Sequence, residues 1–116
     1  MNKGNKLSKI GKGKAQRKAL LRSLSNDLIM HERILTTEAK AKALRPFVER
    51  MITHGTKETV ASRRHVQRFL SKPATNKLMH EVAPMYKGRN GGYTRIIKAP
   101  KRESDLAKMA IIELVK

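Results

Sequence analysis

An excess of positive charge constrains this chain more than any single motif. Its 116 residues include 27 Lys and Arg against 9 Asp and Glu, so the net charge is +18. In a compact particle such self-repulsion destabilises the fold, and a polyanionic partner relieves it. Nucleic acid is the leading candidate for that partner, and an anionic membrane surface is the second.

Length and residue content exclude several classes of protein. A chain of 116 residues has room for one domain with one modest core. It has no cysteine, which excludes disulfides and thiolate metal sites. The N-terminus lacks the apolar core of a signal peptide, and no apolar stretch approaches the ~20 residues of a membrane span. We therefore expect an intracellular protein without a membrane segment. Whether an organellar presequence has been cleaved from it is left open by the sequence.

Residues 1–14 are predicted to form a basic N-terminal arm. The segment "MNKGNKLSKIGKGK" has five lysines, three glycines and no acidic residue. It carries too little apolar surface to offset the entropy of ordering, so we expect it to be disordered without RNA. Basic arms of this kind are frequent in nucleic-acid-binding proteins. Residues 15–116 would then form a single globular domain.

Apolar periodicity predicts two helices in the first half of the chain. Leu20, Leu24 and Leu28 recur every four residues and indicate a helix from Ala15 onward. A second helix is expected after Thr37, which is a plausible N-cap. Pro46 should kink or divide this second helix, and Gly55 should end it.

Two further helices are expected in the middle of the chain. The third, about 58–70, should bury four apolar residues: Val60, Val66, Phe69 and Leu70. The fourth should have Pro73 in its first turn and be closed by Pro84.

Three short apolar stretches read as strands: "RILTT" (33–37), "TRIIKA" (94–99) and "MAIIELV" (109–115). The segment between the last two is polar and long enough for a hairpin connection. The expected fold class is α+β, with about four helices packed on a small antiparallel sheet of two to three strands.

The glycine-rich stretch "YKGRNGGYTRIIK" (86–98) suggests a phosphate-binding loop, but it does not match a nucleotide-binding enzyme loop. No Gly-Lys-Ser/Thr follows Gly88 at the spacing of a P-loop. The dinucleotide pattern needs a strand before it and a helix after it, which is the reverse of the order here. "GRNG" matches the GXXG of KH domains, a weak signal followed here by a strand.

No catalytic or metal-binding pattern is present. The four histidines lie on separate predicted elements without zinc spacing, and the few acidic residues are scattered. We expect no catalytic residue, no metal, no cofactor and no small-molecule substrate, so the chain is not predicted to be an enzyme.

The residues predicted to bind RNA fall into three groups, and all are basic except two glycines and a tyrosine in the third group. Aromatic side chains make up only 3% of the chain, too few for proteins that stack on single-stranded bases. Phe47 and Phe69 lie on core stripes, which leaves Tyr86 and Tyr93 as the candidates for free rings. Contact with phosphates and sugars of folded RNA suits this composition better. The groups are Lys3, Lys6, Lys9, Lys12, Lys14, Arg17, Lys18 and Arg22; then Arg63, Arg64 and Arg68; and finally Lys87, Arg89, Gly91, Gly92, Tyr93 and Arg95.

One alternative is a DNA-binding protein with a helix-turn-helix around residues 58–83. Its second helix would offer only Thr75, Asn76, Lys77 and His80 to read bases, and most of the charge lies elsewhere. A membrane-active arm is less favoured, because residues 1–14 lack a large apolar face.

Five blocks of the sequence resemble the bacterial large-subunit ribosomal protein L-seventeen family. They are "QRKALLRSL", "ILTTEAKAKALRPFVERMIT", "RRHVQRFL", "YKGRNGGYTRIIK" and "MAIIELV", in this order from residue 16 to residue 115. The resemblance implies a structural component that binds large-subunit rRNA near the polypeptide tunnel exit, beside neighbouring large-subunit ribosomal proteins. It also implies a location in the ribosome of the bacterial cytoplasm and no enzymatic activity; an organellar ribosome stays open.

The chain departs from the family pattern at a few places. Lysine, asparagine and glycine open the chain where the family has Arg and His, and Gln16-Arg17 replaces His-Arg. The family's Pro-Gly-Gly-Tyr is Asn90-Gly91-Gly92-Tyr93 here, and the loop 100–108 is altered.

Overall fold

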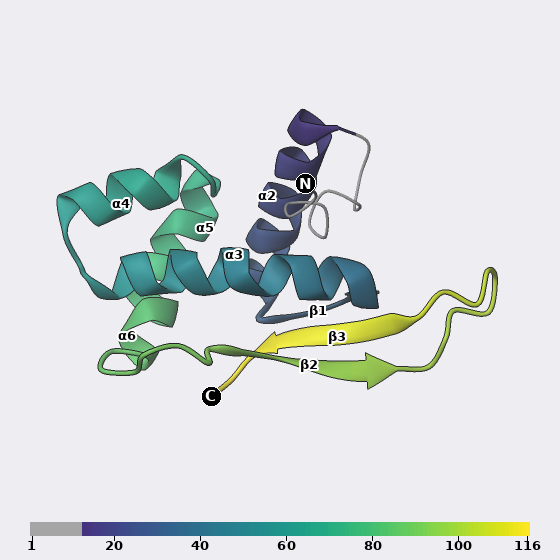
Figure 1. Cartoon of the computed structure of the whole chain (residues 1–116). Coiled ribbons are helices and arrows are strands. Elements are labelled where there is room, and N and C mark those ends of the chain that lie inside the picture. Colours follow the sequence, from purple (N-terminus) through teal and green to yellow (C-terminus); the bar gives the residue numbers. More distant parts are fainter. Residues whose placement is uncertain (1–12) are drawn as a thin grey trace, which may run out of the picture.

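The computed structural model describes residues 13–116, which form helices packed on one small sheet (Figure 1). The predicted arm, with Lys3, Lys6, Lys9 and Lys12, lies outside the described residues apart from Gly13 and Lys14. The elements are α2 (Lys14–His31), β1 (Arg33–Thr37), α3 (Glu38–Thr56), α4 (Val60–Gln67), α5 (Lys72–Lys77), η1 (Leu78–Val82), α6 (Ala83–Met85), β2 (Thr94–Ala99) and β3 (Met109–Leu114).

The three predicted strands form one antiparallel sheet in the order β1-β3-β2. The last strand in sequence, β3, is therefore the central strand and pairs with both neighbours. Because side chains alternate between faces along a strand, Ile34, Ile96 and Ile112 share one face in a single row. The next row in register, Leu35, Ile97 and Ile111, lies on the opposite face. The α+β fold class is confirmed.

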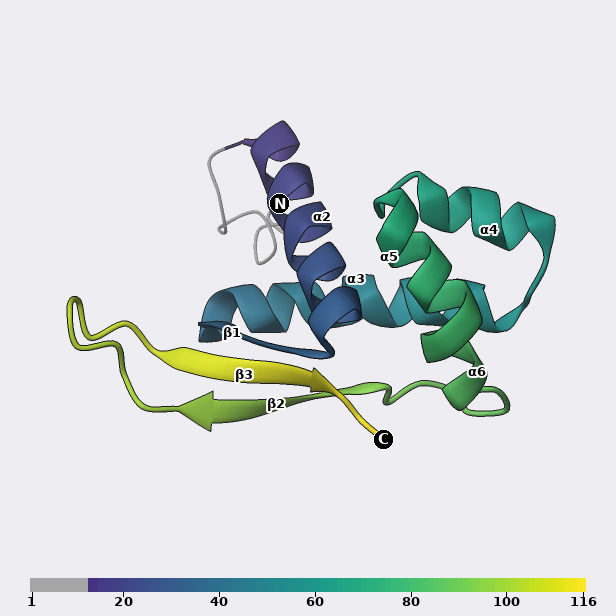
Figure 2. The same ribbon diagram turned by 180° about the vertical axis from the view of Figure 1, so that it is seen from behind.

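The helices gather on one side of the sheet, and the core lies between them (Figures 1 and 2). Leu44, Val48 and Ile52 recur at helical spacing along α3 and are fully buried. They meet Ile112 from the sheet and Leu28 from α2 in a single cluster. The opposite face of the sheet carries no helix in the part of the chain that is described.

Helix α3 begins as predicted and ends within one residue of the expected position, but it does not break at Pro46. The Thr37 hydroxyl accepts a hydrogen bond from the Lys40 amide at 3.3 Å, which confirms the N-cap. The helix then runs unbroken past Pro46, so the prediction that this proline divides it is wrong. Pro46 lies on the exposed side, where water can satisfy the carbonyl that its missing N–H leaves without a partner.

Gly55 is the penultimate residue of α3, so the helix ends within one residue of the predicted stop, and the glycine itself is helical and buried. A Cβ atom at this position would lie 3.1 Å from the Cβ of Ala83 and 3.4 Å from the Cγ of Leu78. The glycine therefore permits a close approach between α3 and the last helical segment.

The remaining helical segments differ from expectation at their ends. A capping box of Thr59 and Ser62 starts α4, which covers less than the predicted 58–70. Val60 is 68% exposed, so its predicted burial is wrong, because the first residue of the helix faces solvent.

The fourth predicted helix is the continuous run α5-η1-α6, and Pro84 lies inside its last turn rather than closing it. The wider η1 turn sends the Ala83 N–H back to the Leu78 carbonyl, five residues away, and so accommodates the proline. Across residues 13–116 no helix has the length and apolar character needed to cross a bilayer.

Candidate nucleic-acid interface

The members of the first basic group that the structure describes lie along helix α2. Lys14, Lys18 and Arg22 are exposed and four residues apart, so they line one side of the helix. Arg17 is half-buried. The Arg22 guanidinium lies 6.0 Å from the centre of the Phe69 ring, just beyond α4. This contact brings the basic side of α2 close to the second basic group.

The second group lies on α4 and the turn after it, and its members are not equivalent. Arg64 and Arg68 are exposed and four residues apart on the same helical side. Arg63 is half-buried, and its Nη2 donates a hydrogen bond to Asn76 Oδ1 on α5. Arg63 therefore joins two helices, whereas Arg64 and Arg68 face solvent.

Side-chain contacts fix α2 relative to the helices of the second group. Asn26 Oδ1 accepts a hydrogen bond from the Ser71 amide at 2.9 Å, immediately before α5. We define the basic helical surface as Lys14, Lys18 and Arg22 of α2 with Arg64 and Arg68 of the α4 region. None of these five side chains forms an ion pair with any residue between 13 and 116.

The third group surrounds the glycine turn. Gly88, Gly91 and Gly92 have φ values of 86°, 111° and 66°, a region that other residues rarely adopt. A Cβ at any of these glycines would meet no atom within 4 Å. The glycines thus make the turn from α6 into β2 and leave its backbone open. Lys87 pairs with Glu58 at 3.4 Å, and both side chains are exposed.

Both tyrosines of this stretch are buried, so the prediction that their rings are free is wrong. Tyr86 is 2% and Tyr93 1% exposed, and their ring centres lie 5.0 Å apart. The Tyr93 hydroxyl donates to the Arg89 carbonyl at 3.0 Å and accepts from the Thr53 hydroxyl at 3.2 Å. Tyr93 therefore closes the glycine turn onto α3 and cannot stack on a base in this conformation.

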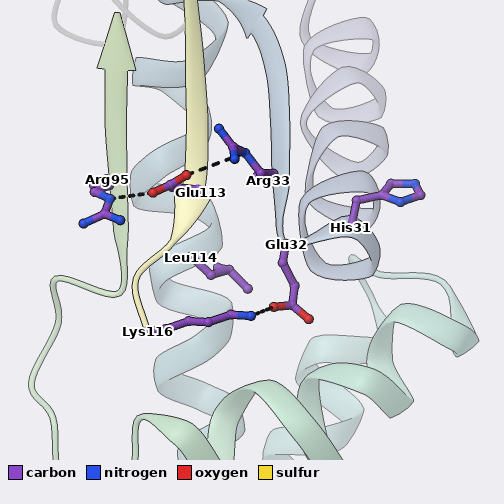
Figure 3. Close-up of a pocket in the computed structure, with 7 residues that line it drawn as sticks. All are labelled: His31, Glu32, Arg33, Arg95, Glu113, Leu114 and Lys116. Carbon is purple, nitrogen blue, oxygen red and sulfur yellow. Dashed lines mark hydrogen bonds and ion pairs between the residues drawn. The ribbon is translucent and has the colours of Figure 1, made fainter.

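Arg95 belongs to an ion-pair row across the outer face of the sheet (Figure 3). Its Nε lies 2.6 Å from Glu113 Oε2, and Arg33 Nε lies 3.7 Å from Glu113 Oε1. The row follows from the register, which places Arg33 and Arg95 on either side of Glu113. Sequence reasoning missed Arg33, because its place beside Glu113 follows from the pairing register of β1 with β3 and not from the pattern within one strand.

The row borders an open pocket at the end of the sheet (Figure 3). Glu32, in the left-handed conformation with φ 68°, lies 2.8 Å from Lys116 Nζ and 3.2 Å from Lys77 Nζ. The hydrogen bond from Lys116, followed by that from Lys77, lowers the pKa of the Glu32 carboxyl. The pocket is lined by His31, Glu32, Arg33, Arg95, Glu113, Leu114 and Lys116.

Two of the four histidines meet, although they lie on separate elements as predicted. The ring centres of His54 on α3 and His65 on α4 are 4.1 Å apart. Desolvation lowers the pKa of His54, and the charges of His65, Lys57 and Arg50 add to this effect. No group of three or more His, Cys, Asp or Glu able to hold a metal ion occurs among residues 13–116.

Sequence comparison identifies the family of this chain. Residues 20–115 match the family described as "Ribosomal protein L17". The chain belongs to this family. The relative named "Large ribosomal subunit protein bL17" from Fusobacterium nucleatum subsp. nucleatum is 51% identical over 116 residues, which are 99% of this chain and all of the relative. Relatives with the same name from Exiguobacterium sp. and Hydrogenobaculum sp. are 52% and 55% identical, over 93% and 86% of this chain and 97% and 86% of their own lengths.

Membership confirms the resemblance drawn from the five sequence blocks. The family consists of ribosomal proteins, which are structural components and not enzymes.

The structure also argues against the helix-turn-helix alternative. Of its four proposed base readers, Thr75 is fully buried, Asn76 is bonded to Arg63 and Lys77 is paired with Glu32. Only His80 is exposed, and one side chain is not a reading surface.

Proposed function

We propose that this chain is a structural constituent of the large ribosomal subunit in the bacterial cytoplasm that binds folded rRNA through phosphate and sugar contacts. Its place would be near the polypeptide tunnel exit, beside neighbouring large-subunit proteins, where it supports subunit assembly and translation. The relatives named as large ribosomal subunit proteins and the family membership support this proposal.

The basic helical surface is the observation that carries the proposal. Its five members are exposed and have no acidic partner among the described residues, so their charge is available to phosphate. Acidic residues that do form ion pairs, such as Glu32, Glu49 and Glu113, neutralise other basic side chains. A polyanion would therefore approach α2 and α4 with little competition from carboxylates.

Contact with the sugar-phosphate backbone of RNA fits this surface better than recognition of its bases does. The burial of Tyr86 and Tyr93 removes the two rings that could have stacked on bases. The open backbone at Gly91 and Gly92 offers a second place where RNA can come close without side-chain obstruction. The lysines at positions 3, 6, 9 and 12 would extend the same contacts from the arm, which we propose orders between RNA helices.

Binding to rRNA can be tested with the full chain and a charge-matched pair of variants. The triple variant Lys14→Gln, Lys18→Gln, Arg22→Gln removes three charges from the basic helical surface. Lys98→Gln, Lys101→Gln, Lys108→Gln removes three from exposed positions around the β2–β3 hairpin. Affinity for purified bacterial large-subunit rRNA is measured from low to high salt, and the logarithm of the binding constant is plotted against the logarithm of salt concentration.

For the triple variant of Lys14, Lys18 and Arg22, the slope of this plot should become shallower by about one unit for each phosphate contact removed. The triple variant of Lys98, Lys101 and Lys108 should change the slope less. The wild-type chain should also sediment with large subunits after a high-salt wash. A sequence-specific footprint on duplex DNA without ribosome association would overturn the proposal, as would equal slopes for the two variants.

A further inference from the structure

We propose that Arg33 and Arg95 form a clamp for a single backbone phosphate of rRNA, with Glu113 as the positioning residue between them. This inference rests on the proposed rRNA binding and adds a specific site to it. The site lies on the face of the sheet away from the helices, and it includes Arg33, which the sequence did not indicate.

The sheet register places the two arginines symmetrically. Glu113 is on the central strand, Arg33 is its partner on β1, and Arg95 is its partner on β2. Neighbouring strands are about 4.8 Å apart, so β1 and β2 lie roughly 10 Å from one another. Glu113 draws both guanidinium groups toward the middle of this gap, through Nε–carboxylate distances of 3.7 Å and 2.6 Å.

The contacts to Glu113 leave the Nη atoms of both arginines available to bind phosphate. Both arginines contact the carboxylate through Nε, and their Nη atoms have no hydrogen bond to any residue of the described chain. The arginine side chains are 62% and 60% exposed, whereas that of Glu113 is 13% exposed. The planar Nη groups can therefore donate to phosphate oxygens, with the carboxylate recessed below them.

The charge of the row and the apolar side chains beside it fit an RNA strand at this position. Two guanidinium groups and one carboxylate leave the row with one positive charge, on a face that no helix covers (Figures 1 and 2). The adjacent row on the same face is apolar, with Leu35 62% and Ile97 41% exposed. An RNA strand offers both kinds of partner, since its phosphates alternate with riboses whose carbon atoms can pack on aliphatic side chains.

A double-mutant cycle on binding of the full chain to purified large-subunit rRNA tests the clamp. Arg33→Gln and Arg95→Gln should each weaken binding about tenfold, the scale of a charge-assisted hydrogen bond. If both arginines hold one phosphate, the double variant should be little weaker than either single variant. Combining Arg33→Gln with the control Arg50→Gln, an exposed arginine on α3, should multiply the two separate effects.

Glu113→Gln separates positioning from charge. It raises the net charge by one, so a purely electrostatic surface would bind rRNA more tightly after the change. The clamp predicts weaker binding, because the guanidinium groups lose the carboxylate that orients them. Glu103→Gln, an exposed position in the hairpin loop, makes the same charge change and should not weaken binding. Far-ultraviolet circular dichroism confirms that each variant is folded, and the double variant Arg33→Lys, Arg95→Lys keeps the charge but should still weaken binding.

Several outcomes would overturn the clamp, and they differ from failure of the proposed function. If the wild-type chain does not bind rRNA, the function itself fails. If it binds but the arginine effects multiply independently, or Glu113→Gln binds more tightly, only the clamp fails. If the arginine variants bind naked rRNA normally yet wash out of large subunits, this face contacts a protein and the clamp is wrong.

Discussion

Replacing Glu49 should loosen the start of β2 and destabilise the whole domain. Glu49 Oε2 accepts two hydrogen bonds from Thr94, from the backbone amide at 3.2 Å and from the hydroxyl at 2.9 Å. Thr94 is 2% exposed, so Glu49→Ala leaves both donors without their acceptor in a nearly dry place. The same carboxylate lies 3.7 Å from Nε of Arg45, whose side chain is 47% exposed, so this ion pair should contribute little to stability.

The magnitude follows from these contacts. A hydrogen bond to a charged acceptor contributes about 1.5–3 kcal/mol, and water can reach part of this site because the Glu49 side chain is 22% exposed. We therefore expect the Glu49→Ala variant to lose about 2–3 kcal/mol of unfolding free energy in total. This corresponds to a fall of roughly 10 °C in the melting temperature.

Urea unfolding followed by circular dichroism, at a salt concentration that screens the net charge, measures the loss. The control Arg45→Ala removes the ion pair but keeps both bonds to Thr94, and it should cost at most about 0.5 kcal/mol. Glu49→Gln retains an amide oxygen as acceptor and should fall between the two. A Glu49→Ala variant as stable as wild type would refute the anchoring role, and an equally unstable Arg45→Ala would assign the effect to the ion pair.

Three further predictions concern packing, pH and a buried hydroxyl. Gly55→Val should cost more than about 2 kcal/mol in urea unfolding, since even a Cβ would lie 3.1 Å from the Ala83 Cβ; near-wild-type stability would contradict this. Burial lowers the pKa of His54, so the folded state binds protons less readily than the unfolded state, and the unfolding free energy should fall as pH drops below ~6.5. His54→Gln should reduce that decline, and a variant with the same pH profile as wild type would contradict this role of His54. Tyr86→Phe leaves the Val115 carbonyl without its donor and should lower the unfolding free energy by about 1–2 kcal/mol in the same assay, whereas an unchanged value would show that water replaces the donor.

Local sequence patterns predicted the elements well because each pattern reports a period along one element. The leucines at positions 20, 24 and 28 marked α2, and the alternation in 33–37 and 94–99 marked strands that the structure has at the same residues. Thr37 as N-cap of α3 was equally accessible, because a cap acts within one helical turn.

The errors occur where a residue's role depends on a distant neighbour. The packing role of Gly55 is visible only when Ala83 is placed against it, and Pro84 looks like a helix end until the wide η1 turn accommodates it. Tyr93 follows glycines in a basic stretch, yet its partner Thr53 lies 40 positions away on α3. Arg33 joined the candidate interface only when pairing of β1 with β3 set it beside Glu113.

The central position of β3 has a consequence for the order of folding. Neither β1 nor β2 has a strand partner in the described structure until residues 109–114 are in place. During synthesis, the helices from α2 to α6 can collapse on local contacts, but the sheet must wait for a segment that is made more than 70 residues after β1. A chain released before residue 109 would lack the sheet and the carboxylate between the two arginines. The sheet, and with it the row of Arg33, Glu113 and Arg95, is thus completed only once β3 has been made and has paired with both neighbouring strands.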